Sequence, residues 1–445
     1  MEKKELIVPR TLKGFRDYLP EMMISRERIM ETARTVYRSY GFAPIDTPAL
    51  EYFEILSGKG SDETDKQLYH FEDHGGRKVG LRFDLTVPFA RFAAQHIPRL
   101  GTPFKRYHIA PVWRGENTQT GRYREFVQCD FDTIGTTSIV SDIETALVIH
   151  DLLDAIGFEN QYTIRINNRL ILSGLLEKLG LSEKTVPVLR ALDKLAKAGR
   201  EKVAQEMAET ANATPDQTNA LLNFAELKGT NNEVLPSLSR ILTSNPQGEE
   251  GIEKLNTILH EIHSAGISEE SVVIDVSIAR GLDYYTGTIY ETFLRELPTI
   301  GSVCSGGRYD NLAGLYTKLP LPGIGASLGL DRLLAAMEEL GRIEKVSTPA
   351  RVFLPFFAEE RLHDYLEIAA KLRKSGVTVE FYPEAKKLGT QLKYADKRGF
   401  VFVLVIGSEE FDRGICQLKN MKTGETEEIL LTDLVSRLMT LPAKT

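Results

Sequence analysis

The sequence predicts an α+β fold in two parts: a first part with two paired strands and a long helical region, then a smaller α/β domain. Three observations predict it. Between residues 104 and 135, two segments of alternating side chains flank a turn-rich loop, as in two antiparallel strands. From 170 to about 266 the chain is rich in Leu, Ala, Lys and Glu at helical spacing. Beyond residue 349, short β-rich runs alternate with helical patterns, which is typical of a small α/β domain.

Composition places the chain among ordinary globular proteins. Its 445 residues are 42% hydrophobic and 26% charged, enough to bury a large core over about three domains. The longest apolar stretch, residues 400–406, is far too short to span a membrane, and the first residues do not resemble a secretory signal. Cys129, Cys304 and Cys416 are too widely spaced for a disulfide framework. We therefore expect a cytoplasmic protein in a reducing compartment, without a membrane partner.

The first predicted element is a helix over residues 25–40 that leads into an extended segment. Apolar residues recur at helical spacing from Ile29 to Tyr37, and Gly41 ends the pattern. Pro44 and Pro48 then favour extended chain over residues 42–51, because proline lacks a backbone donor and biases its predecessor away from helix.

Residues 81–88 read as a strand that carries Asp84 and Thr86. Two residues apart, these side chains would project from one face and could together receive an ammonium group. An ordinary exposed strand face would show the same pattern.

The run from 104 to 135 is the most informative part of the sequence. Residues 105–114 and 122–132 read as strands around a loop at 115–121. Polar side chains share one face of the second strand, which is costly to bury unless a ligand or a neighbour satisfies them, so we expect a polar cavity. The residues on this face are Arg122, Arg124, Phe126, Gln128, Asp130 and Asp132.

The predicted helical region from 170 to 266 carries no catalytic constellation. His260 and His263 are three apart, but no third metal ligand lies nearby in the sequence. A β-rich run at 272–278 follows, and after it Arg280 precedes Tyr284 and Tyr285. The fork of an arginine suits a carboxylate or a phosphate, and aromatic hydroxyls can shape a small planar site. An arginine that caps a strand beside core tyrosines explains the pattern equally well.

The last features are a glycine-rich run, a linker and a basic patch. Small residues at 321–329 precede a helical pattern in which Arg332 falls in the first turn, where the helix dipole favours an anion. The best linker candidate is 347–349. Although the net charge is −7, residues 371–398 hold eight basic against three acidic residues, which suits phosphates or a solvated helix face.

Several of these segments together resemble one family. The string Arg-Gly-Leu-Asp-Tyr-Tyr-Thr-Gly at 280–287, followed by Ser-Gly-Gly-Arg-Tyr-Asp at 305–310, resembles the histidine-binding signature of histidyl-tRNA synthetases. That family belongs to class II of the aminoacyl-tRNA synthetases. Residues 25–51, 104–135 and 321–334 are similar to the three class II motifs in order, and 386–397 is similar to the anticodon-binding domain.

The resemblance implies a domain plan and a reaction. It implies a class II catalytic domain built on an antiparallel sheet over 1–346, with a helical insertion at about 170–266, and a C-terminal α/β anticodon-binding domain over 349–445. The implied activity is histidine–tRNA ligation: L-histidine reacts with ATP and Mg²⁺ to give histidyl-adenylate and pyrophosphate, and the histidyl group passes to the 3′ end of tRNA(His). The first class II motif implies a homodimer.

The resemblance also implies site residues. Those implied for histidine are Asp84, Thr86, Gln128, Asp132, Arg280, Tyr284 and Tyr285. Those implied for ATP are Arg114, Glu116, Arg122 and Arg332. Arg280 and Arg114 would act catalytically, and the metal would enter with ATP rather than through a side-chain cluster. The sequence departs from the usual pattern at Trp113, where phenylalanine or tyrosine is more common, and in a loop that lacks its frequent proline.

Two other functions stay open at this point. The chain could be a non-catalytic relative similar to the regulatory subunit of ATP phosphoribosyltransferase, which keeps the synthetase core as a histidine sensor, or a plain tRNA-binding module. The ATP arginines and the anticodon-binding segment speak against the first, and the polar site against the second. The enzyme reading requires that Arg114, Arg122, Arg280 and Arg332 converge on one nucleotide.

Overall fold

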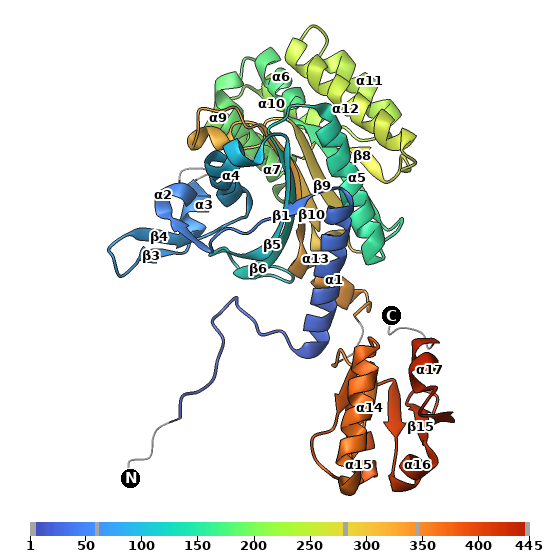
Figure 1. Cartoon of the computed structure of the whole chain (residues 1–445). Helices are drawn as coiled ribbons and strands as arrows, with labels where there is room; N and C mark the ends of the chain where they lie inside the picture. Colours follow the sequence, from blue (N-terminus) through green and yellow to red (C-terminus); the bar gives the residue numbers. More distant parts are fainter. Residues whose placement is uncertain (1–5, 58–61, 279–283, 344–346, 441–445) are drawn as a thin grey trace. The chain divides into compact units, whose positions relative to one another are not determined.

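The computed structural model describes residues 6–57, 62–278, 284–343 and 347–440. The chain divides into two compact units (Figure 1). The first comprises Met1–Arg16 with Ile29–Gly341, and the second comprises Asp17–Arg28 with Arg342–Thr445. Helix α1 (Pro20–Ser39) confirms the predicted helix over 25–40, begins five residues before it and ends one residue earlier. No helix of the described part of the chain is both long and apolar enough to cross a membrane.

The first unit is built on an eight-stranded sheet in the order β1-β5-β6-β11-β10-β9-β7-β8. Only the outer pairs β1/β5 and β7/β8 run parallel, so the sheet is predominantly antiparallel, as predicted. Its strands are β1 (Ala43–Pro44), β5 (Phe104–Trp113), β6 (Glu125–Ile134), β7 (Tyr162–Asn168), β8 (Val272–Ile274), β9 (Thr288–Leu294), β10 (Cys304–Tyr309) and β11 (Gly323–Gly329).

Strands β5 and β6 confirm the predicted hairpin. They pair antiparallel from Phe104 opposite Ile134 to Trp113 opposite Glu125. The return strand begins at Glu125, three residues later than predicted, so Arg122 and Arg124 lie in the connecting loop rather than on the strand face.

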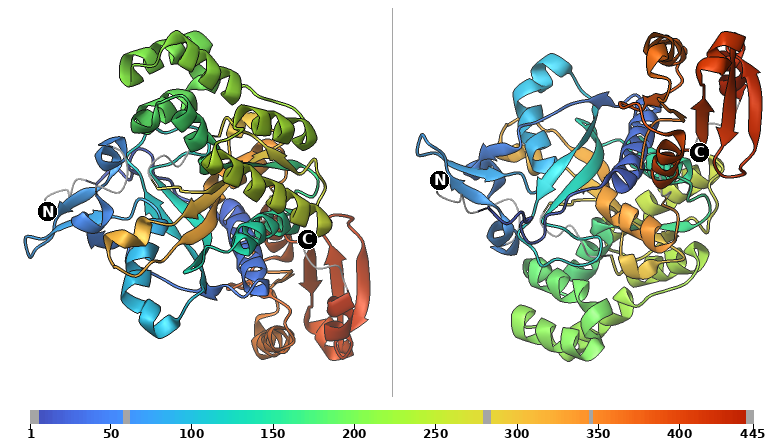
Figure 2. Two further views of the ribbon diagram at one scale, coloured as in Figure 1. Left: turned by 90° about the horizontal axis from the view of Figure 1, so that it is seen from above. Right: turned by 90° about the horizontal axis from the view of Figure 1, so that it is seen from below.

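A small three-stranded sheet lies beside the main one. It consists of β2 (Leu50–Tyr52), β4 (Lys78–Leu81) and β3 (His70–Glu72) in that order, and the β3–β4 hairpin projects from the unit in all views (Figure 2). The accompanying helices are α2 (Phe53–Leu56), α3 (Asp62–Gln67), α4 (Thr86–Leu100), α5 (Ile139–Ile156) and α13 (Leu330–Glu339).

Seven helices between β7 and β8 confirm the predicted helical insertion. They gather at one end of the unit, and α12 packs against α5 and α6 (Figure 1). The helices are α6 (Arg169–Lys178), α7 (Thr185–Asp193), α8 (Leu195–Ala198), α9 (Arg200–Ala211), α10 (Pro215–Ala225), α11 (Asn231–Ile241) and α12 (Pro246–Ser264).

Two predicted strands are wrong or too long. Residues 81–88 are not a strand: β4 ends at Leu81 and α4 begins at Thr86. The carboxylate of Asp84 accepts the backbone N–H groups of Thr86 (3.1 Å) and Val87 (2.9 Å), which lack partners at a helix start, and this capping favours helix over strand. Strand β8 stops at Ile274, because Asp275 Oδ1 accepts the Ser277 N–H at 3.0 Å and turns the chain.

The second unit contains the predicted α/β domain. Its sheet has the order β13-β12-β14-β15-β16, with a parallel half (β13, β12, β14) and an antiparallel half that the sequence reasoning missed. The elements are β12 (Val352–Leu354), α14 (Leu362–Lys374), β13 (Val379–Phe381), α15 (Leu388–Lys397), β14 (Phe402–Val405), α16 (Ser408–Arg413), β15 (Ile415–Asn420), β16 (Thr426–Leu430) and α17 (Leu434–Thr440).

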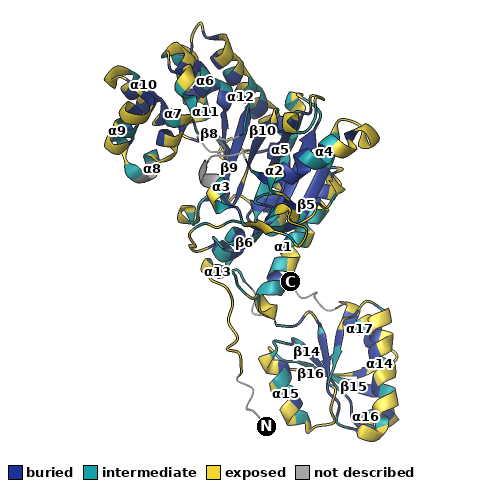
Figure 3. Ribbon diagram, turned by 90° about the vertical axis from the view of Figure 1, so that its left-hand side faces the viewer, coloured by how far each residue is buried: buried dark blue, intermediate teal, exposed yellow. Residues whose placement is uncertain are grey.

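The hydrophobic cores are formed largely by residues of the strands and of the helix faces that pack on them. The strands of both units are largely buried, while the outer faces of the helices in the second unit are exposed (Figure 3). In that unit, Val352 and Leu354 pack in one apolar cluster while Phe353, between them, packs in another. Strand β12 is therefore buried on both faces, which explains its continuous apolar sequence.

Candidate active site

A cavity of about 280 Å³ lies where the loop after β5 meets β6, β10, β11 and the start of α13. It brings together five of the predicted site residues: Arg114, Glu116, Arg122, Gln128 and Arg332. Its other lining residues are Gly121, Tyr123, Phe126, Ser302, Val303, Ser305, Ser327, Gly329 and Asp331. Segments more than 200 residues apart in the sequence therefore build one polar cavity with three arginines.

Each arginine of the cavity is held by a neighbour. Arg114 donates from Nε to the Phe83 carbonyl at 3.0 Å, and its guanidinium carbon lies 4.3 Å from the centre of the Phe83 ring. Arg332, in the first turn of α13 as predicted, donates from Nη1 to the Ser302 carbonyl at 2.6 Å. Arg122 lies 3.5 Å from the carboxylate of Glu116. Fixed guanidinium groups of this kind stabilise polyphosphate charge without having to be reordered.

Gln128 connects this cavity to a second polar cluster. Its Nε2 donates to Ser327 Oγ at 3.0 Å, while its Oε1 is buried and has no hydrogen-bond partner within the described structure. A buried unpaired acceptor normally has an explanation, and a ligand donor such as an ammonium group would satisfy it.

The second cluster holds the buried acids Asp130 and Asp132 and the half-buried Asp84 near Arg106. Arg106 Nη2 lies 2.6 Å from Asp132 Oδ2 and 3.8 Å from Asp130 Oδ2, and its side chain is fully buried. Burial raises the pKa of Asp130 to about 7 and also raises the pKa of Asp84. The sequence analysis missed Arg106. In the register of β5 and β6 this arginine lies directly opposite Asp132, so pairing the two predicted strands could have identified it.

Three tyrosines adjoin these acids. Tyr284 meets Tyr285 and Tyr309 edge to face, with ring centroids 4.9 Å and 6.2 Å apart. Tyr309 donates its hydroxyl to Asp132 Oδ1 at 2.6 Å, so both oxygens of Asp132 face protein groups. Burial raises the pKa of Tyr284 and Tyr285, which keeps the hydroxyls protonated as hydrogen-bond donors.

At Gly323 and Gly325 the glycine-rich run makes room for protein side chains rather than for a ligand. Residues 323–329 form strand β11, and a Cβ on Gly325 would lie 2.3 Å from Asp132 Oδ1. A Cβ on Gly323 would lie 2.3 Å from the Tyr309 ring. These two glycines make room for side chains of the acidic cluster, whereas Gly329 lines the cavity.

The predicted residues thus fall into two neighbouring groups. The ATP set and Gln128 line the cavity, while Asp84, Asp132, Tyr284 and Tyr285 belong to the cluster of acids and tyrosines. Thr86 is the first residue of α4, immediately after the Asp84 turn. Arg280 belongs to 279–283, outside the described residues, while the other three arginines of the predicted set, Arg114, Arg122 and Arg332, line one cavity.

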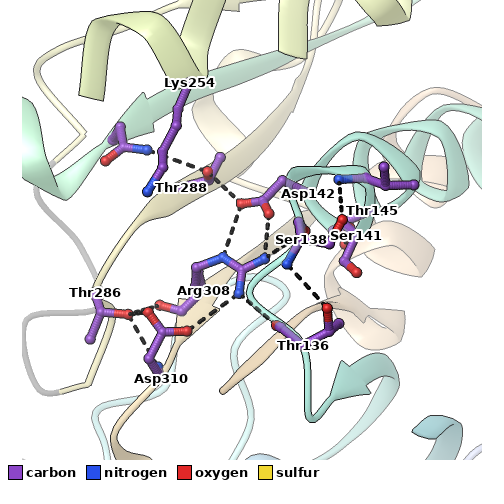
Figure 4. A network of polar contacts seen from close by, with 12 residues as sticks. Thr136, Ser138, Ser141, Asp142, Thr145, Lys254, Thr286, Thr288, Arg308 and Asp310 are labelled. Carbon is purple, nitrogen blue, oxygen red and sulfur yellow. Dashed lines mark hydrogen bonds and ion pairs between the residues drawn. The ribbon is translucent and has the colours of Figure 1, made fainter. Parts of the chain in front are cut away.

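A buried arginine supports the segment that carries the tyrosines. Arg308 on β10 pairs with Asp142 on α5 through Nη2, donates to the Thr136 carbonyl at 3.1 Å and lies 3.3 Å from Asp310 (Figure 4). Asp310 in turn accepts the Thr286 hydroxyl at 2.7 Å. The sequence analysis gave no role to Arg308. The string Ser-Gly-Gly-Arg-Tyr-Asp at 305–310, which contains this residue, was the signal that could have pointed to it.

The cavity contains side-chain carboxylates, the kind of protein ligand that magnesium binds. Mg²⁺ usually binds one or two protein carboxylates together with substrate phosphates. Glu116 and Asp331 are carboxylates of the cavity lining, so the donor set fits a metal that arrives with a nucleotide. Elsewhere in the described residues, no group of three or more His, Cys, Asp or Glu could hold an ion.

Comparison with known proteins covers nearly the whole chain. The histidyl-tRNA synthetase family model matches residues 14–333, and the anticodon binding domain model matches residues 351–441. A protein of Rhodopirellula baltica named histidine–tRNA ligase is 64% identical over 424 residues, which are 95% of this chain and 96% of that protein.

Solved structures agree with this. The crystal structure of histidyl-tRNA synthetase from Nostoc superposes with a TM-score of 0.88 at 34% identity, covering 98% of this chain and 99% of that one. A Bacillus halodurans structure titled ATP phosphoribosyltransferase regulatory subunit/histidyl-tRNA synthetase has a TM-score of 0.74 at 22% identity, covering 88% and 97%, and shares the fold. The cavity, both domain matches and the close relatives together show that the chain belongs to the histidyl-tRNA synthetase family.

Proposed function

We propose that this histidine–tRNA ligase activates L-histidine with Mg-ATP to histidyl-adenylate and then transfers the histidyl group to the 3′ end of tRNA(His). The observation that carries the proposal is the single cavity lined by Arg114, Arg122 and Arg332. Three guanidinium groups in one half-enclosed space are suited to a triphosphate.

The activation step builds negative charge on the α-phosphate as the histidine carboxylate attacks. Arg114, whose position is fixed by Phe83, would stabilise that charge from one side, and Arg280 from the other. Arg122 and Arg332 would hold the outer phosphates, and Glu116 would lie by the adenine. Glu116 and Asp331 would hold magnesium that enters with ATP, and the ion would supply positive charge that offsets the charge of the leaving pyrophosphate.

The histidine subsite would lie between Gln128 and the cluster of acids and tyrosines. The free Oε1 of Gln128, with Asp84 and Thr86, would receive the α-ammonium group. Asp132, Tyr284 and Tyr285 would recognise the imidazole. A site that hydrogen-bonds a ring rejects analogues that leave its buried polar groups unpaired.

We also propose how the chain divides into domains, that it forms a homodimer, and that it works in the cytoplasm. Residues 1–346 would form the catalytic domain, with the insertion at about 170–266, and residues 349–445 would bind the anticodon region of tRNA(His). The exposed side chains of Leu50 and Tyr52 beside the first class II motif support a homodimer. Cys129, Cys304 and Cys416 are buried in the described structure and form no disulfide, which supports a reducing compartment, the cytoplasm.

Histidine-dependent exchange of pyrophosphate into ATP tests the activation step, and charging of tRNA(His) tests the transfer. Arg280→Ala is expected to lower the exchange rate by about 10²–10³-fold, as when one preorganised donor is removed. Exchange near the wild-type rate in that variant would contradict the role of Arg280.

A histidine-sensing regulatory subunit is the second candidate, because the Bacillus halodurans structure shares the fold and its title names an ATP phosphoribosyltransferase regulatory subunit beside histidyl-tRNA synthetase. The three cavity arginines and the match of the anticodon binding domain at 351–441 favour the enzyme. A chain that binds histidine but supports no exchange would favour the sensor.

A further inference from the structure

The segment just before α1 lies against the loop that lines the nucleotide cavity. Residues 6–13 are exposed, but Gly14, Phe15 and Arg16 are half-buried. The carbonyl of Gly14 accepts the backbone N–H of Arg124 at 2.8 Å, which adds a backbone partner at the end of the loop. Arg124 Nη1 also donates to the Lys13 carbonyl at 3.4 Å. Gly14 to Arg16 are thus docked on one specific surface.

Arg16 covers a residue of the cavity wall. Its Nη1 donates to the Tyr123 hydroxyl at 2.5 Å, and its guanidinium carbon lies 4.9 Å from the centre of the Tyr123 ring. Tyr123 itself lines the cavity, next to Arg122. The hydroxyl and the ring face of Tyr123 are therefore both held by one side chain from outside the cavity.

Gly14 fits against the loop only because it has no side chain. Its φ is +88°, a conformation that L-residues rarely adopt, and a Cβ there would lie 2.7 Å from Arg124 Cγ and 3.0 Å from Thr118 Cγ2. Arg124 in turn donates from Nε to the carbonyl of Glu116, another residue of the cavity. The contact therefore reaches both sides of the loop.

We propose that Gly14 and Arg16 form a positioning strap for the nucleotide site, in which Arg16 sets the affinity for ATP by fixing Tyr123 and the loop 115–124. The inference rests on the cavity binding ATP, as proposed above. A loop that must be ordered by the ligand itself binds it more weakly, because the ordering entropy is lost on binding. Because the strap orders the loop 115–124 during folding, ATP binding does not lose this entropy.

Arg16→Ala tests the strap in the full-length protein. Loss of the hydrogen bond and the cation–π contact to Tyr123 is expected to raise the KM for ATP about 3- to 30-fold in pyrophosphate exchange, with the KM for histidine changed less than about twofold. Arg16→Lys keeps the charge and should recover part of the effect. Arg10→Ala removes the same charge from an exposed position of the same segment and should behave as wild type.

A second readout does not require catalysis. Trp113, the single tryptophan, precedes Arg114 at the start of the loop, so its fluorescence can follow ATP binding without histidine. The midpoint of the ATP titration should shift in Arg16→Ala by the same factor as the KM. If the wild type bound ATP but showed no exchange, the proposed enzyme would fail while the strap would still be tested.

Two results would overturn the strap. One is an ATP affinity in Arg16→Ala equal to that of Arg10→Ala. The other is a parallel rise in the KM for both substrates with a lowered melting temperature, which would mean general destabilisation. Gly14→Ala, which pushes the loop without removing a charge, should weaken ATP in the same direction as Arg16→Ala, and an unchanged affinity in it would equally contradict the proposal.

Discussion

Asp130 is the residue whose protonation should control the stability of the first unit. It is buried, one of its oxygens has no hydrogen-bond partner within the described structure, and Arg106 is closer to Asp132 (2.6 Å) than to Asp130 (3.8 Å). One buried guanidinium cannot neutralise two carboxylates. Burial therefore raises the pKa of Asp130 to about 7, from an ordinary value of 3.8.

The sign of the effect follows from proton binding. Between about pH 4 and pH 7 the folded state holds a proton on Asp130 that the unfolded state has released, so the free energy of unfolding falls as pH rises through this window. A shift of about three pH units corresponds to about 4 kcal/mol. Asp130→Asn removes the titration, so the variant should gain up to about 4 kcal/mol over the wild type at pH 8 and little at pH 4.

Thermal unfolding at pH 4.5 and pH 8, followed by Trp113 fluorescence in the first unit, measures this difference. The expected gain at pH 8 is on the order of 5–10 °C in Tm. Glu125→Gln changes a carboxyl at the start of the same strand and should leave the pH dependence unaltered. If Asp130→Asn loses stability equally at both pH values, the carboxyl is ionised and paired in the fold, and the reasoning is wrong.

Three further predictions follow from packing and donor chemistry. Arg308→Met leaves Asp142 buried without its partner and should cost about 3–5 kcal/mol, seen as a lowered Tm, whereas Arg77→Met, at an exposed pair, should cause no comparable loss. Gly325→Ala places a Cβ 2.3 Å from Asp132 Oδ1 and should cost about 1–3 kcal/mol in thermal unfolding; Gly389→Ala, with nothing within 4 Å, should not. Chelation with EDTA should abolish pyrophosphate exchange, with full recovery in excess MgCl₂ and no change in Tm, because the metal enters with ATP; a persistent loss would indicate a structural ion.

The sequence by itself determined the elements whose signals are local. The alternation over 104–135 predicted the β5–β6 hairpin, and the helical patterns beyond residue 349 predicted helices of the second unit such as α15. Arg332 could be placed in the first turn of a helix because the start of that helix is marked by the residues around it. Family resemblance then named five of the residues that line the cavity, since motifs keep their order along the chain.

Only the tertiary structure decided how charges and close approaches are resolved. Asp84 was expected on a strand because its competing use, the capping of α4, depends on where β4 ends. Arg106 lies between two acids, and Arg16 lies against Tyr123 from 107 positions away in the sequence. Periodicity describes which face of a segment is apolar, but neutralising a buried charge takes a partner that any part of the chain can supply, so these pairings emerge only once the chain is folded.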